Sequence, residues 1–78
     1  MKLYLLSQEE NNDWDTYDSF VVACEDIETA RHTLPSTQLT WGQEYSSWCK
    51  TPDAVTVKYL GEAADGIQGI ICASFNAG

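Results

Sequence analysis

Short runs of hydrophobic residues predict four β-strands and one helix in the order β-β-α-β-β. The predicted strands cover residues 2–7, 19–25, 54–60 and 69–75. Leu3 and Leu5 share one face of the first strand. Tyr4 and Leu6 share the other face, because successive residues of a strand point to opposite sides. Both faces are apolar, which predicts a central strand covered on both sides, with the second strand as its antiparallel neighbour.

The single helix is predicted over residues 27–33, between the second and third strands. Asp26 is a suitable N-cap, since its carboxylate can accept a bond from an amide of the first turn. The proline after Leu34 ends the helix, because the residue before a proline avoids helical geometry. The residues expected to face the sheet are Ile27, Ala30 and Leu34, at helical spacing.

These elements predict an α+β fold, a small antiparallel sheet of about four strands with one short helix packed on a face, in one domain covering residues 1–78. A chain of this length buries roughly 60% of its unfolded surface, so the core is small. Trp41, Tyr45 and Trp48 lie between the helix and the third strand. The pattern leaves open whether they belong to the core or to an interface. We expect Trp41 and Trp48 to cover the sheet face that the helix leaves open.

An acidic segment, residues 9–18, separates the first two predicted strands. It contains five acids, two aromatic residues and no base. Burying it would strip water from unpaired carboxylates, so we expect the sheet to present it to solvent. Its candidate partner-binding residues are Glu9, Glu10, Asp13, Trp14, Asp15, Tyr17 and Asp18. Exposed aromatic residues among like charges are typical of a protein-binding patch. The alternative is that one ring, Tyr17 above all, folds back onto the sheet.

The net charge of −8 results from twelve acids and four bases. Such a surface repels phosphate, which argues against direct binding to nucleic acid or an anionic membrane. The natural electrostatic partner is a basic protein surface. The alternative is that the acidity serves only to keep a small protein soluble.

The sequence offers no pattern typical of an enzyme, a metal site or a cofactor site. Cys24, Cys49 and Cys72 are odd in number and widely spaced, which favours reduced thiols in a cytosol. We expect Cys24 and Cys72 to pack as small hydrophobic residues. Counting from Asp13, the spacing fails the calcium-loop pattern. His32 has no nucleophile beside it in sequence, and we expect no catalytic residue, no metal and no cofactor. Neither a signal peptide nor a membrane span is expected.

Five stretches of the chain form a recognisable set of short motifs. They are residues 2–8 (KLYLLSQ), 11–19 (NND, an aromatic residue and DTYDS), 21–23 (VVA), 26–31 (an acidic helix start leading to AR) and 73–78 (ASFNAG). Together they resemble a family of small acidic phage proteins. The succession of short strand, acidic Asn/Asp loop, strand and helix is also similar to some small anti-CRISPR proteins, which are acidic single domains that bind an effector complex and block DNA.

This resemblance implies a phage-derived inhibitor in the host bacterial cytoplasm. It would act as a DNA mimic on the basic, nucleic-acid-binding surface of a CRISPR effector, as a monomer or weak dimer. One alternative is a phage module that binds another host protein. Another is a small structural or oligomeric phage protein, since the first and last strands are apolar on both faces and an exposed strand edge can pair between chains.

Overall fold

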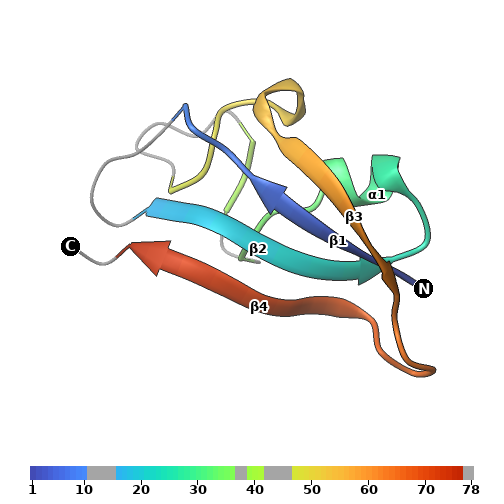
Figure 1. The fold of residues 1–78 in the computed structure, drawn as a ribbon. Coiled ribbons are helices and arrows are strands. Elements are labelled where there is room, and N and C mark those ends of the chain that lie inside the picture. The colour runs from blue at the N-terminus through green and yellow to red at the C-terminus, as the bar shows by residue number, and fades with distance from the viewer. Residues whose placement is uncertain (11–15, 37–38, 42–46, 77–78) are drawn as a thin grey trace.

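A computed structural model describes residues 1–10, 16–36, 39–41 and 47–76 of the chain. The sheet and helices are drawn in Figure 1. Their bounds are β1 (Lys2–Ser7), β2 (Thr16–Cys24), α1 (Ile27–Arg31), the 3-10 helix η1 (Pro52–Ala54), β3 (Thr56–Glu62) and β4 (Gly69–Asn76). The predicted combination of a small antiparallel sheet and one short helix is confirmed. The fold is mostly β, because the helix has only five residues.

The four strands form one sheet in the order β3-β1-β2-β4, and every neighbouring pair is antiparallel. β1 and β2 are therefore the central strands, and their predicted pairing is confirmed, with Lys2 opposite Cys24 and Ser7 opposite Ser19. β3 and β4 follow one another in sequence but occupy opposite edges. Their connection, residues 63–68, passes the ends of both central strands (Figure 1).

The core lies between one face of the sheet and α1. Tyr4 and Leu6 of β1 point to this face and are buried, as are Phe20 and Val22 opposite them in β2. They form one cluster with Ala30 of the helix. Leu3 and Leu5, on the other face of β1, are only half-buried. β1 was expected to be covered on both faces, but it is fully covered only on the face toward the helix.

The helix begins as predicted and ends earlier. The Asp26 carboxylate accepts a hydrogen bond of 2.8 Å from the Thr29 amide, which confirms the N-cap. Ala30 is fully buried, but Ile27 is 44% exposed, so its predicted place in the inward stripe is wrong. α1 ends at Arg31 rather than at residue 33. A helix of little more than one turn cannot direct residues as far apart as 27 and 34 to the same surface.

The basic residue at the end of α1 ties the helix to the segment before β3. The Arg31 guanidinium donates to the carbonyl oxygen of Val55 at 2.7 Å and to that of Pro52 at 3.4 Å. Val55 itself is buried in the core. Hydrogen bonds from a charged donor stabilise more than neutral ones, so Arg31 helps to fix the start of β3.

Two strands, β2 and β3, differ from the prediction by more than one residue at a boundary. β2 begins at Thr16, three residues before the predicted start, so the last part of the acidic segment belongs to the sheet. β3 covers Thr56–Glu62 instead of 54–60, because η1 takes the residues before it. Before Ser19, turn-forming and polar residues interrupt the hydrophobic pattern on which the predicted bound depended, whereas the apolar residues Ala54 and Val55 extended that pattern beyond the start of β3.

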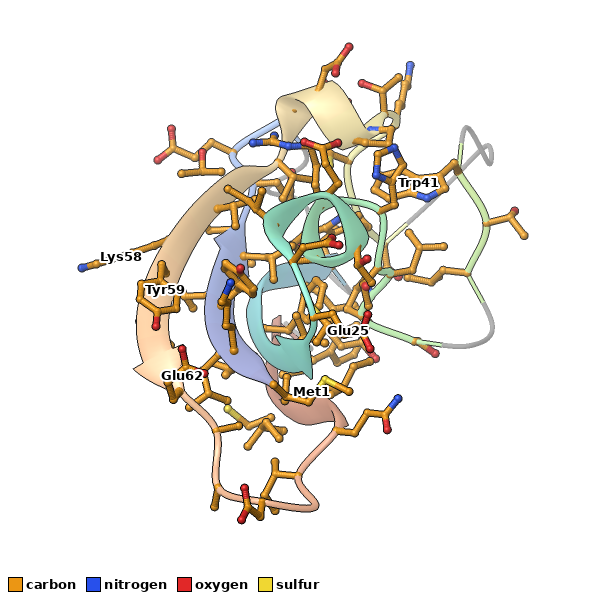
Figure 2. All side chains as sticks on the ribbon, turned by 90° about the vertical axis from the view of Figure 1, so that its right-hand side faces the viewer. Met1, Glu25, Trp41, Lys58, Tyr59 and Glu62 are labelled. Atoms are coloured by element: carbon orange, nitrogen blue, oxygen red, sulfur yellow. The ribbon has the colours of Figure 1, made fainter. Side chains whose placement is uncertain are left out.

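The tryptophans lie on the same face of the sheet as the helix, which corrects the expectation that they cover the opposite face. Trp48 is buried in the cluster that contains Ala30, and its ring meets Phe20 at 5.2 Å between centroids. Trp41 is partly buried against this cluster and lies on the helix side of the sheet (Figure 2). Tyr45 lies outside the described residues. A helix of five residues leaves most of that face uncovered, and Trp41 and Trp48 pack on part of it.

Candidate partner-binding surface

Hydrogen bonds between the end of β1 and the start of β2 hold the two ends of the acidic segment together. The Gln8 amide donates to the Asp18 carbonyl at 3.3 Å, which extends the β1–β2 ladder by one bond. The Gln8 side chain donates to the Tyr17 carbonyl at 3.0 Å. Gln8 is only 3% exposed, and a buried amide needs such a partner. These two bonds hold both ends of the acidic segment beside the sheet.

The role of Gln8 in joining the two ends of the acidic segment was not predicted from the sequence. A signal was present, because Gln8 continues the alternation of Tyr4 and Leu6 on the buried face of β1. A polar side chain at a core position of a strand must satisfy its hydrogen bonds locally. Its position next to the acidic segment therefore indicated an anchoring role.

The segment that carries Trp48 is bonded to the same end of the sheet at two points. The Tyr17 amide donates to the Ser47 carbonyl at 2.7 Å. The Lys50 amide donates to Oε1 of Glu10 at 3.0 Å. The second bond joins residues forty positions apart, and no spacing in the sequence indicated it.

Three of the predicted binding carboxylates lie together at this end, on exposed residues: Glu9, Glu10 and Asp18. We call these three residues the acidic end. The hydrogen bonds of Glu10 and Asp18 come from neutral donors, the Lys50 amide and the Ser19 hydroxyl, the latter at 3.0 Å. A neutral donor leaves the charge of a carboxylate in place, so these two side chains stay available to a cation.

Tyr17 is placed differently from these carboxylates. It is half-buried in β2 and pairs with Phe75 of β4, with ring centroids 4.8 Å apart. The ring thus packs on the sheet, as the alternative interpretation of Tyr17 had it, and only part of it is accessible to a partner. The predicted binding residues Asp13, Trp14 and Asp15 lie outside the described residues.

The three thiols fall into two environments. Cys24 and Cys49 are buried, whereas Cys72 is exposed on β4, so the expectation that Cys72 packs as a hydrophobic residue is wrong. Burial raises the pKa of the Cys49 thiol to about 11, with a smaller contribution from the nearby Glu10 carboxylate. Burial also raises the pKa of Cys24. Neither buried thiol has the lowered pKa that a nucleophilic cysteine needs.

Within the described ranges, no three His, Cys, Asp or Glu side chains gather where they could hold a metal ion. His32 is exposed at the end of α1, with Nδ1 2.8 Å from the Glu28 carbonyl oxygen. No helix in the described part of the chain is both long and apolar enough to cross a membrane.

Comparison with known proteins adds no family to these observations. The chain matches no protein-family model, and it has no significant match among curated proteins or solved structures. The surface itself is therefore the basis for a proposed function.

Proposed function

We propose that this chain is a protein-interaction module that binds a basic surface of another protein through its acidic end. In its most specific form, it is a phage-derived inhibitor of a host defence complex, an anti-CRISPR protein that occupies the surface where the effector binds DNA. It has no catalytic role in this proposal.

One observation supports the proposal above the others. Glu10 and Asp18 are exposed at one end of the sheet, and their hydrogen bonds come from neutral donors. A chain of net charge −8 that presents carboxylates in this way attracts the Lys and Arg residues that otherwise hold phosphates. The bond from the Gln8 side chain fixes the acidic end to β2, and the bond from the Lys50 amide to Glu10 fixes it to the segment before η1, which lowers the entropy lost on binding.

The test uses purified CRISPR effector complexes and a target-DNA binding assay, with the chain added at increasing concentration. The binding variant carries Glu9→Gln, Glu10→Gln and Asp18→Asn. The control variant carries Glu25→Gln, Glu62→Gln and Asp65→Asn, which removes the same charge from exposed positions elsewhere. Glu25 and Glu62 lie at the far end of the strands, since Glu25 follows Cys24, the β2 partner of Lys2, and Glu62 is itself the β3 partner of Lys2 (Figure 2).

We expect the binding variant to need about ten times more protein for the same inhibition, since interfacial charge pairs carry roughly 1.5 kcal/mol or more when close. The control variant should inhibit like the wild type, and inhibition should weaken as salt rises. Adding Asp13→Asn and Asp15→Asn to the binding variant extends the test to the whole acidic segment. Equal losses of inhibition in both variants would indicate a general charge effect. A wild-type chain that does not inhibit would support the alternative that the acidity serves only to keep the protein soluble.

A further inference from the structure

The two outer strands of the sheet expose very different edges. In an antiparallel sheet, alternate backbone N–H and C=O groups of an outer strand point away from the sheet and can pair with another strand. β3 carries Lys58 and Glu62, whereas β4 carries no charged residue. Figure 1 shows β4 along the outer side of the sheet, with no described helix or strand beyond it. β4 therefore lacks the charges that commonly protect such an edge.

The side chains of β4 also remain accessible. Ile70, Ile71 and Phe75 are 40%, 48% and 47% exposed, and Cys72 is exposed as well. Ile71 has no partner in the register with β2, because Val21 pairs with Cys72 and Val22 with Ile70. An apolar strand with a free backbone edge is the kind of surface to which another β-strand adds.

We propose that β4 pairs antiparallel with β4 of a second copy of this chain, around a twofold axis, and so joins two four-stranded sheets into one. The charge distribution favours a second copy of this chain as the partner of β4. Residues 66–78 contain no Asp, Glu, Lys or Arg, in a chain of net charge −8. Contact through β4 brings two copies together without placing carboxylates against one another. An isologous contact of this kind also closes on itself and does not continue into a fibre.

Symmetry restricts the register of this pairing. Residues that face each other across an antiparallel pair point to the same side of the sheet, so the twofold axis passes midway between one residue of β4 and the same residue of the second copy. With the axis at Ala73, Cys72 lies opposite Ser74 of the second copy, and Ile71 lies opposite Phe75 of the second copy. The two Cys72 Cα atoms are then about 8 Å apart on the same face, from the rise and spacing of strands. A thiol cross-link between copies can therefore report the pairing.

A single edge contact is small, so the dimer is weak and forms at high protein concentration. The measurement is sedimentation equilibrium from micromolar to millimolar protein, at low and high salt. We expect dimerisation to strengthen with salt, because screening reduces the repulsion between two acidic copies. The partner binding proposed above weakens with salt. The two proposals therefore fail independently.

Two matched residues, one on each outer strand, give the test variant and its control. Ile71→Lys places a charge on the β4 edge, and Leu60→Lys places one on the β3 edge. Leu60 is 47% exposed and, like Ile71, is skipped in the register of its strand pair. We expect Ile71→Lys to raise the dimer dissociation constant at least tenfold and Leu60→Lys to leave it unchanged. Ser74→Lys is a second variant for the case that Ile71→Lys lowers the melting temperature.

A short bis-maleimide provides the direct readout of register. We expect it to join two wild-type chains into a species of twice the 8.7 kDa chain mass, and to join none in Cys72→Ser. The proposal is overturned if the wild type stays monomeric at millimolar concentration. It is also overturned if the dimer survives both β4 variants, or if Leu60→Lys disrupts it as strongly as Ile71→Lys does.

Discussion

The β3 and β4 edges of this sheet differ in what holds each strand and in what protects it. β3 follows Val55, which is buried and bonded to Arg31, and its exposed residues include Lys58 and Glu62. Among the described strands β4 pairs only with β2, and it consists of uncharged residues. Lys58 points outward beside β3 (Figure 2), as expected for an edge that resists pairing. The fold therefore anchors and protects the β3 edge and leaves the β4 edge accessible.

The largest expected contrast is in thiol reactivity. Cys72 lies exposed on β4, whereas Cys24 and Cys49 are buried in the core. At pH 8 we expect one thiol per folded chain to react at once with a maleimide, and the other two to react more than a hundred times more slowly. Mass spectrometry of the labelled peptides identifies the site. Fast labelling of Cys49 would mean that the core opens easily.

The same thiols give a stability contrast at alkaline pH. Burial raises the pKa of Cys49 from 9.0 to about 11, so the folded state holds this proton more tightly than the unfolded state does. The contribution of the protonated Cys49 thiol to the unfolding free energy is fully present below pH 9 and is lost as the pH rises toward 11. We expect Cys49→Ala to flatten the fall in unfolding free energy between pH 9 and 11, measured by urea titration. Cys72→Ala should leave the slope unchanged.

Truncation of one apolar side chain at each edge tests how firmly the two edges are held. Val55→Ala removes a buried side chain before β3, and we expect it to cost about 2.5 kcal/mol of unfolding free energy. Ile70→Ala, in β4, should cost about 1 kcal/mol, because Ile70 is already 40% exposed. Urea unfolding of both variants measures the difference. Equal costs would mean that β4 is held as firmly as β3.

The hydrogen bonds from α1 to the start of β3 should contribute less. Arg31→Met keeps much of the aliphatic stem and removes the donor to the Val55 and Pro52 carbonyls. We expect a loss of about 1.5 kcal/mol, the lower range for a hydrogen bond to a charged group. Amide exchange should quicken in β3 and not in β4. A uniform increase across the sheet would contradict a local anchoring role.

The smallest effect concerns the outer part of β3. The Tyr59 hydroxyl donates to Oε1 of Glu62 at 3.1 Å, and this bond raises the pKa of the phenol. We expect Glu62→Gln to lower that pKa and to leave the unfolding free energy nearly unchanged, as is usual for exposed positions. Absorbance of the phenolate during a pH titration measures the shift. An unchanged pKa would show that Glu62 does not hold the phenol proton.

Local patterns in the sequence predicted much of this fold. The bounds of β1 are as predicted and those of β4 differ by one residue, because each strand is built around an unbroken apolar run of four residues. The Asp26 cap was predictable because it depends on neighbouring residues alone. The start of β2 at Thr16 was not, since turn-forming residues there hide a strand that pairs with the distant end of β4.

The arrangement of the surface was harder to predict than the strands. Exposure of Glu9, Glu10 and Asp18 follows from the cost of burying charge. Exposure of Cys72 does not follow from its apolar neighbours, because it depends on β4 being an outer strand. Strand order is decided by contacts between residues far apart in the chain, and local patterns of the sequence do not reveal those contacts. The bond between Glu10 and the Lys50 amide was hidden for the same reason.

The strand order has a consequence for how the chain acquires its structure. β1 and β2 are near neighbours in sequence and form the centre of the sheet, whereas Lys2 pairs with Glu62 and Thr16 with Asn76. A nascent chain can thus assemble its central hairpin while both flanking strands are still being synthesised. The late, long-range docking of those strands sets a slow folding rate. A ribosome-bound fragment ending before residue 56 should leave two apolar hairpin edges open, and chaperones that bind extended segments are the natural factors to occupy them.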